Sequence, residues 1–380
     1  MCSLERIAFL FVDFHVKLVQ FENTFLEVLM ELGINTFGDA GLDPVTGKIV
    51  SHAERLNQLV EEIATADRVG LDVFSIGEHH RKDYAVSAPD IVLAAGAAVS
   101  KNIRLSSGVT VLSSDDPVRV FERFSTLDGI SNGRAEIMAG RGSFIESFPL
   151  FGYDLNDYNE LFNEKLDLLM TLQKGGKINW QGKHRAGLQD ADIFPESVQK
   201  EIPIWIASGG TPQSSERAAR LGPPLVLAII GGSPFQFKRV VDFYREVGRK
   251  SGHDPSKLKV ATNSHGFIWD TDQEARDIFY PAISASMTKL GRERGWGAYT
   301  REAFDAMSDP EGALYVGSPE TVARKIVMLY ETMGIERFTM QTPVGVMSHD
   351  KVLRTIELFG KEVAPLVKEG DRKSVVKERV

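Results

Sequence analysis

Short apolar runs alternate with longer segments of helical periodicity along most of the chain. The runs are rich in β-branched residues and almost continuously apolar, as parallel strands covered on both faces are. They lie at Ile7–Asp13, Val73–Ile76, Arg104–Leu112, Ala135–Ala139, Pro203–Ala207, Leu225–Ile230, Lys259–Ile268 and Arg337–Gln341. The pattern therefore predicts eight strands separated by helices.

The intervening segments carry apolar residues at the 3.6-residue period of a helix with one buried face. Clear examples are Glu54–Val69, Pro117–Ile130 and Tyr158–Gln173, and Thr271 with Glu274 forms a capping box at another helix start. Eight strand-then-helix units predict a closed (β/α)8 TIM barrel of the α/β class, with an open doubly wound sheet as the alternative.

Two segments are longer than the alternation requires. Ile178–Pro195, before the fifth strand, is predicted to form a small hairpin, and Pro281–Tyr315, after the seventh, a mobile insertion that could act as a lid. A single barrel domain is expected over residues 1–367, followed by a charged, frayed tail over residues 368–380.

Composition narrows the classes of partner. The formal net charge is −8 with both signs mixed and no basic block, so nucleic acid is not expected as a partner. Cys2 is the single cysteine, which excludes an intramolecular disulfide and fits a reducing cytoplasm. The apolar start at Ile7–Val12 is too short to span a membrane and lacks a small-residue cleavage site, so a cytoplasmic protein is expected.

Polar and glycine residues follow most of the predicted strands. The C-terminal ends of the strands form the working face of a barrel. The segments there are Glu78–His80, Ser113–Asp115, Gly140–Ser143, Ser208–Thr211, Gly231–Ser233 and Gln341–Thr342. We therefore expect a binding face rich in backbone N–H groups at this end.

The segment after the fifth strand is the best candidate for an anion site. It reads Ser208, Gly209, Gly210, Thr211 and Pro212, and Ser214 lies one turn further on. A glycine pair allows close approach of backbone to a ligand, and the following helix directs its N-terminal N–H groups and positive dipole end to the same place. The plain alternative is a strand-to-helix turn with Thr211 as the N-cap.

Arg141 stands between two glycines just past the fourth strand. Its guanidinium could bind a phosphate with two parallel hydrogen bonds, or form a salt bridge at the rim. Other phosphate and nucleophile motifs fail. Gly140–Gly142 lacks the third glycine of a dinucleotide fingerprint, Gly41–Lys48 has the wrong spacing for a phosphate loop, and Ile206 rules out a nucleophile elbow at Ser208.

Glu78, His79 and His80 follow the second strand. Adjacent residues of a strand point to opposite sides, so a metal shared by the two histidines is not expected. The histidine that faces the mouth could act as an acid or base near neutral pH. The alternative is that both are packed, hydrogen-bonded histidines.

Several of these segments together resemble the luciferase-like flavin monooxygenases, close to the type of the bacterial luciferase α subunit. They are Gly77–His80, Arg104–Arg119, Leu127–Arg134, Gly140–Gly142, Phe194–Pro195, Ile202–Pro203, Ser208–Thr211 and Gly222–Gly231. The likeness covers about residues 55–265 and is weaker beyond. The combined pattern is specific to the family, whereas no single tetrapeptide is.

The resemblance implies a (β/α)8 barrel with reduced FMN in its mouth. It implies that the peptide bond between Gly108 and Val109 is a non-proline cis bond that supports the flavin ring. Matching positions imply further roles: phosphate binding for Arg141, Thr211 and Ser214, and catalysis for His79.

The chain also departs from the family. Tyr158 and Asn159 stand where luciferase has a second phosphate-binding arginine, and Tyr158 could donate one hydrogen bond instead. Gly140 replaces a reactive cysteine and is expected to leave more room near the flavin. The resemblance therefore does not imply light emission or a long-chain aldehyde substrate for this chain.

The activity implied is a two-component monooxygenase. Reduced FMN would come from a separate flavin reductase and react with O2 to a flavin hydroperoxide that oxidises a small apolar molecule. The alternatives are a hydride-transfer enzyme that uses a deazaflavin coenzyme, and a non-catalytic flavin-binding subunit. Candidate aromatic residues for the substrate pocket are Phe11, Phe14, Phe144, Phe148, Trp296 and Tyr299.

A homodimer is also implied. The family pairs through its second and third helices, here Pro89–Val99 and Pro117–Ile130, and the small residues Ala94–Ala98 would allow close approach.

Overall fold

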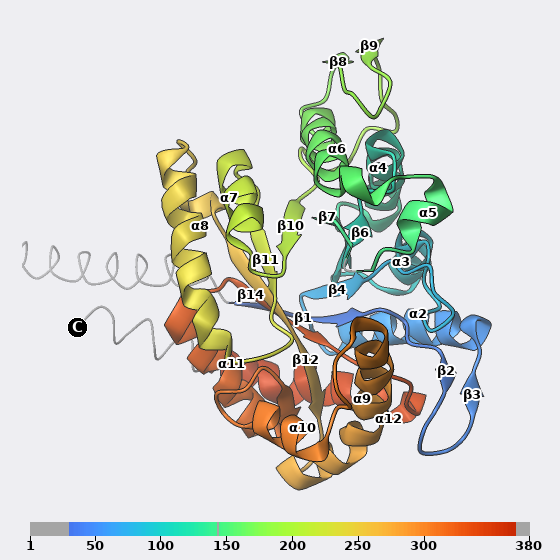
Figure 1. Ribbon diagram of the computed structural model, residues 1–380, viewed down its shortest axis with the longest axis vertical. Coiled ribbons are helices and arrows are strands. Elements are labelled where there is room, and N and C mark those ends of the chain that lie inside the picture. The colour runs from blue at the N-terminus through green and yellow to red at the C-terminus, as the bar shows by residue number, and fades with distance from the viewer. Residues whose placement is uncertain (1–29, 143, 370–380) are drawn as a thin grey trace, which may run out of the picture.

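The structure, a computed structural model, describes residues 30–142 and 144–369. Within these ranges eight parallel strands close into a barrel, because β10 pairs with β7 at the ends of the sheet path. In order around the barrel they are β1 (Glu31–Thr36), β4 (Val73–Ile76), β5 (Arg104–Ser107), β7 (Ala135–Gly140), β10 (Ile204–Ser208), β11 (Leu225–Ala228), β12 (Val260–Ile268) and β14 (Arg337–Gln341). The predicted TIM barrel is confirmed (Figure 1).

The first strand differs from the prediction. Strand β1 lies between β14 and β4, with Ile34 opposite Met340 on one side and Phe74 on the other. Ile7–Asp13 lies outside the described residues, and its assignment as the first barrel strand was wrong. The sequence pattern did not indicate a strand at Glu31–Thr36, because the inward-facing positions of this strand are glycine and polar residues. Glycine is required at position 33, since a Cβ there would lie 2.2 Å from the carbonyl oxygen of Val73.

The third predicted strand, Arg104–Leu112, is divided. Strand β5 ends at Ser107, the Gly108–Val109 peptide bond is cis, and β6 (Thr110–Val111) then pairs with β7. The cis bond that the resemblance implied is therefore present. The remaining strands agree with the prediction to within two residues at each end.

Helices cover the outside of the barrel. They are α2 (His52–Arg68), α3 (Pro89–Val99), α4 (Pro117–Ser131), α6 (Tyr158–Leu172), α7 (Pro212–Leu221), α8 (Lys238–Lys250), α11 (Pro319–Met333) and α12 (His349–Leu358). Shorter elements are α5 (Ser147–Phe151), the single turns η1 (Leu155–Asp157), η2 (Pro234–Phe237), η3 (Pro255–Lys257) and η4 (Phe359–Val363), and the hairpin of β2 (Gly41–Leu42) with β3 (Ile49–Val50). Of the described helices, none combines the length and apolarity that crossing a bilayer requires.

Both predicted insertions are present, one with different bounds. Strands β8 (Ile178–Trp180) and β9 (Leu188–Ala191) form the expected antiparallel hairpin. After β12 the chain forms α9 (Asp272–Arg294), α10 (Arg301–Ser308) and β13 (Tyr315–Gly317), which pairs with β12. Pro281 lies inside α9, so an insertion that starts there was wrong; the helix begins at the Thr271 cap, whose hydroxyl accepts from the N–H of Glu274. Closure of this segment over the mouth stays a prediction.

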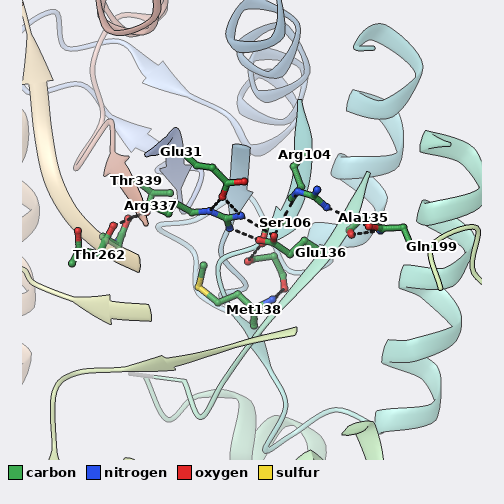
Figure 2. A network of polar contacts seen from close by, with 12 residues as sticks. Glu31, Arg104, Ser106, Ala135, Glu136, Met138, Gln199, Thr262, Arg337 and Thr339 are labelled. Carbon is green, nitrogen blue, oxygen red and sulfur yellow. Dashed lines mark hydrogen bonds and ion pairs between the residues drawn. The ribbon is translucent and has the colours of Figure 1, made fainter. Parts of the chain in front are cut away.

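A polar layer and then an apolar layer fill the N-terminal end of the barrel. Arg337 on β14 donates two hydrogen bonds to Glu136 on β7, and Glu31 accepts a third at 2.7 Å (Figure 2). The next layer consists of Met138, Trp205, Val226 and Ala261. Because these side chains close one end, a ligand can enter only from the C-terminal ends of the strands.

Candidate functional site

A cavity of about 410 Å³ opens above the apolar layer at the C-terminal ends of the strands. Its floor and walls come from inward-facing strand residues and from the loops that follow them: Asn35, Phe37, Val109, Met138, Ala207, Val226 and Asn263, with His79, Arg141, Phe144 and Tyr158 at the sides. The lining is mostly apolar with a few convergent polar groups, which is the usual character of a cofactor or small-molecule site.

Gly108 is required by the packing beneath this cavity. A Cβ at Gly108 would lie 2.6 Å from Oδ1 of Asn35 and 2.9 Å from the Cβ of Ser75. Oδ1 of Asn35 is buried and has no hydrogen-bond partner among the described residues. The Val109 side chain lies against Gly140, where a Cβ would come within 2.7 Å of a Val109 methyl carbon. The room expected beside Gly140 is therefore filled by Val109.

Glu78, named from the sequence within Glu78–His80 but without a role, organises the loop after β4. Its Oε2 accepts a hydrogen bond from the N–H of Val111 (2.9 Å), and its Oε1 lies 2.9 Å from Nε2 of His80. The Glu78 carboxylate raises the pKa of His80 through this hydrogen bond. No pattern in the sequence indicated the contact with Val111, because Val111 is 33 residues away from Glu78.

Both histidines line the cavity, contrary to the expectation that they point to opposite sides. That expectation assumed a strand, but β4 ends at Ile76 and residues 77–80 form a loop, where side chains need not alternate.

His79 is buried in an aromatic cage. Its ring centroid lies 4.4 Å from that of Phe37, 4.5 Å from that of Tyr84 and 5.0 Å from that of Phe144. Burial lowers the pKa of His79, while the nearby Glu146 carboxylate, 3.8 Å from its Nδ1, acts in the opposite direction. His79 is consequently a neutral imidazole at neutral pH, able to accept a proton.

The predicted anion-binding residues meet at one edge of the cavity. Arg141 donates to Oδ1 of Asn159 and to Oγ of Ser214, each at 2.9 Å, and Thr211 donates to Ser214 at 2.9 Å. Thr211 occupies the N-cap position of α7, but its side chain caps no backbone N–H. Thr211 is therefore the N-cap residue by position, as the plain alternative expected, while its hydroxyl belongs to a cluster of donors and does not cap the helix. Nearby, Gly210 donates its N–H to Oγ of Ser208, which shapes the turn that Gly209 continues.

Arg217 adds a second guanidinium that sequence reasoning missed. Burial and then the charge of Arg141 lower the pKa of Arg217, so the two cations interact. Within the described ranges neither guanidinium has a carboxylate partner; Arg217 lies over the Phe162 ring and Arg141 over the Tyr158 ring. The sequence spacing did indicate that Arg217 belongs with the other two residues. Thr211, Ser214 and Arg217 follow one another at intervals of three residues and therefore share one face of the helix.

Other predicted residues take different places. The Tyr158 hydroxyl donates to the carbonyl of Gly142 (2.7 Å), so in this arrangement it is not a donor to the anion cluster. Phe144 lines the cavity, and Phe148 is buried behind it, stacked on Tyr158. Trp296 is half exposed, and neither it nor Tyr299 lines this cavity, while Phe11 and Phe14 lie outside the described residues.

The structure thus combines a (β/α)8 barrel, a mostly apolar mouth cavity and two arginines at its edge. A profile of the family described as "Luciferase-like monooxygenase" matches residues 30–337, and the chain belongs to that family. The chain is 23% identical to the alkanal monooxygenase alpha chain of Aliivibrio fischeri, over 80% of this chain and 90% of that protein. The named relatives support a general monooxygenase role, and hence an oxidoreductase.

Solved structures share the fold. The oxygenating constituent of 3,6-diketocamphane monooxygenase from Pseudomonas putida, in complex with FMN, matches with a TM-score of 0.70 at 23% identity, over 89% of this chain and 98% of that one. The coenzyme F420-dependent tetrahydromethanopterin reductase from Methanopyrus kandleri matches with a TM-score of 0.67 at 20% identity, over 88% of this chain and 99% of that one.

Proposed function

We propose that this chain is a flavin-dependent monooxygenase that uses reduced FMN and O2 to oxidise a small, largely apolar organic molecule. The observation that carries the proposal is the pair Arg141 and Arg217, which lies beside the mouth cavity without a carboxylate partner among the described residues. Two like charges held together are unfavourable unless an anion lies between them, and the phosphate of FMN is such an anion.

The residues present fit FMN. Arg141, Arg217, Thr211 and Ser214 supply donors for the phosphate, and the N-terminal N–H groups of α7 point to the same edge. The apolar floor, with Val109 and Ala207, supplies a surface for the ring. The unpaired Oδ1 of Asn35 offers an acceptor to a ring N–H.

Bound reduced FMN would supply the electron pair and protons that convert one oxygen atom of O2 to water while the other atom enters the substrate. The protein's own part is to exclude water and to manage protons. His79, buried and neutral, accepts or returns a proton at one ring nitrogen while Glu146 steadies the charged form. The reduced flavin would be delivered by a separate flavin reductase.

The deazaflavin-dependent relatives of the same fold define the competing function, hydride transfer. Anaerobic titration of the protein with reduced FMN and, in parallel, with a reduced deazaflavin coenzyme separates the two. We expect binding of reduced FMN, followed by oxygen uptake on mixing with air. Binding of the deazaflavin alone would replace the proposal by hydride transfer, and binding of neither would remove both.

A further inference from the structure

A second cavity, of about 290 Å³, lies next to the first. Phe144 lines both cavities, and Tyr84, which lines the second, contacts His79 of the first at 4.5 Å between ring centroids, with the two rings tilted by 30°. The walls come from the loops after β1, β4, β7 and β14 and from α9. The second cavity is therefore built by five separate segments, immediately beside the proposed site of chemistry.

Asp39 lies in the wall of this cavity with one carboxylate oxygen unused. The N–H of Gly345 donates to its Oδ1 at 2.8 Å, while its Oδ2 is buried and has no hydrogen-bond partner among the described residues. Asp39 is only 6% exposed. Burying a carboxylate oxygen without a hydrogen-bond donor is unfavourable in free energy, because the oxygen loses its hydrogen bonds to water and no protein donor replaces them.

The backbone fixes Asp39 in this position. Ala40 donates its N–H to the carbonyl of Asp83, and Ala85 donates to that of Gly38, both at 2.8 Å, so residues 38–40 pair with residues 83–85. Gly345 has a φ of +83°, and a Cβ there would lie 2.2 Å from the carbonyl oxygen of Ala282 on α9. The backbone of Asp39 and the Gly345 N–H that binds its Oδ1 are therefore both held in place.

The other charged residues of this cavity are already matched. Arg81 donates to both carboxylate oxygens of Glu293, at 2.6 and 2.8 Å, and Lys289 pairs with Asp83. The lining thus has three acidic residues (Asp39, Asp83 and Glu293) against two basic ones (Arg81 and Lys289), a formal excess of one negative charge. Arg55, which also acts on Asp39 electrostatically, is bound by Glu62.

We propose that this second cavity is a substrate subsite in which Oδ2 of Asp39 accepts a hydrogen bond from a protonated amine or a hydroxyl on an otherwise apolar molecule. That the bound molecule is a substrate rests on the proposed function, whereas the binding site at Asp39 does not. A molecule anchored at Asp39 extends toward Phe144 and, beyond it, His79. Oxidation is therefore directed to a carbon distant from the anchored group.

Three probes with one phenethyl skeleton test the site: 2-phenylethylamine, 2-phenylethanol and ethylbenzene. Their affinities are measured by calorimetry on the flavin-free protein, with Asp39→Asn and, as a matched control on the same loop, Asp43→Asn. Asp43 does not line the cavity, and its carboxylate is already used by Val45 and Thr46.

We expect the amine or the alcohol to bind about tenfold or more tightly than ethylbenzene, the scale of one hydrogen bond to a charged group. Asp39→Asn should abolish the preference, because it replaces the free acceptor by an amide donor, and Asp43→Asn should keep it. Which of the two polar probes binds better identifies the anchored group.

Diffraction from wild-type crystals soaked with 4-bromophenethylamine gives a second readout that does not depend on a variant folding. The anomalous signal of bromine should lie in the second cavity, with the nitrogen at hydrogen-bond distance from Oδ2 of Asp39. Equal affinities for all three probes, or bromine only in the larger cavity, would overturn the subsite. Normal binding of reduced FMN with no preference for either polar probe over ethylbenzene removes the subsite alone, whereas such a preference without FMN binding removes the proposed function alone.

Discussion

The guanidinium of Arg337 and the carboxylate of Glu136 meet across the full width of the barrel, through hydrogen bonds of 2.6 and 3.0 Å. Their strands, β14 and β7, are four steps apart around the barrel in either direction, so the two residues start on opposite walls (Figure 2). Both side chains are buried, and the Trp205 ring lies 4.4 Å from the guanidinium. This pair ties the two halves of the barrel together beneath the cavity.

Replacing one member of that pair should destabilise the protein. Burial favours the neutral form of Glu136, but the charge of Arg337 keeps the pKa of Glu136 below its usual range. We expect Glu136→Gln to reduce the free energy of unfolding by about 3–5 kcal/mol in urea denaturation, because it removes the buried counter-charge of Arg337 and leaves only the half-exposed Glu31. Glu31→Gln, at the exposed end of the same network, should cost less than about 1 kcal/mol. Equal effects of the two substitutions would show that burial does not decide the strength of the network.

The two arginines at the cavity edge should both contribute to cofactor affinity. We expect Arg141→Met to weaken binding of reduced FMN by about 10–100-fold, and Arg217→Met to weaken it by about tenfold, the scale of charge-assisted hydrogen bonds. Anaerobic fluorescence titration measures both, and Arg220→Met, which faces solvent on the same helix, is the control. Unchanged affinity in both variants would place the phosphate elsewhere.

His79 should act on the rate rather than on flavin binding. We expect His79→Gln to slow substrate oxidation in single turnover by about 10²-fold or more while the affinity for reduced FMN stays within about threefold. Because burial lowers the pKa of His79, its neutral form persists below the usual titration range, and the wild-type rate should decline only at more acidic pH. That acidic limb should be missing in His79→Gln. The surface variant His253→Gln should keep both the rate and the limb.

Asp39 should make stability depend on pH. Burial, partly opposed by the hydrogen bond from Gly345, raises the pKa of Asp39 from 3.8 to about 6. An acid whose pKa is higher in the folded state binds its proton more tightly there, so its stabilising contribution is present below about pH 4 and is lost as pH rises to about 6. Relative to Asp39→Asn, the wild type should therefore lose up to about 3 kcal/mol of unfolding free energy across this window. A difference that stays flat between pH 4.5 and 7 in urea denaturation would contradict the burial argument.

The exposed apolar side chains on α3 and α4 provide the test of the proposed homodimer. Ile91 and Val99 on α3 and Ile130 on α4 are 68%, 50% and 56% exposed in the single chain. If these helices form the interface, Ile91→Asp should raise the dimer dissociation constant by about tenfold or more in sedimentation equilibrium. Leu221→Asp, on α7, should leave it unchanged. A monomeric wild type at micromolar concentration would remove this proposal.

Part of the cavity could be predicted because local sequence determines local shape. Gly108, Arg141, Thr211 and Ser214 follow strands, and in a barrel all strands deliver their next residues to one end. Strand β1 could not be predicted in the same way. Its inward residues, Gly33 and Asn35, are selected by contact with β4 and with Gly108 and make its sequence look like a turn.

Contacts between distant segments produced the rest of the site. Arg217 becomes part of the anion cluster only because α7 lies beside the loop after β7. Oδ2 of Asp39 lacks a donor among the described residues only because the loops after β4 and β14 enclose it. No periodicity or motif in the sequence indicates either contact, since the partners are up to 306 residues apart.

The sequence by itself determined the alternation of strands and helices, and therefore the barrel and the end at which its loops gather, because backbone periodicity is a local property. Only the tertiary structure decided which charges remain unpaired there. Whether a buried group finds a partner depends on every segment that closes around it.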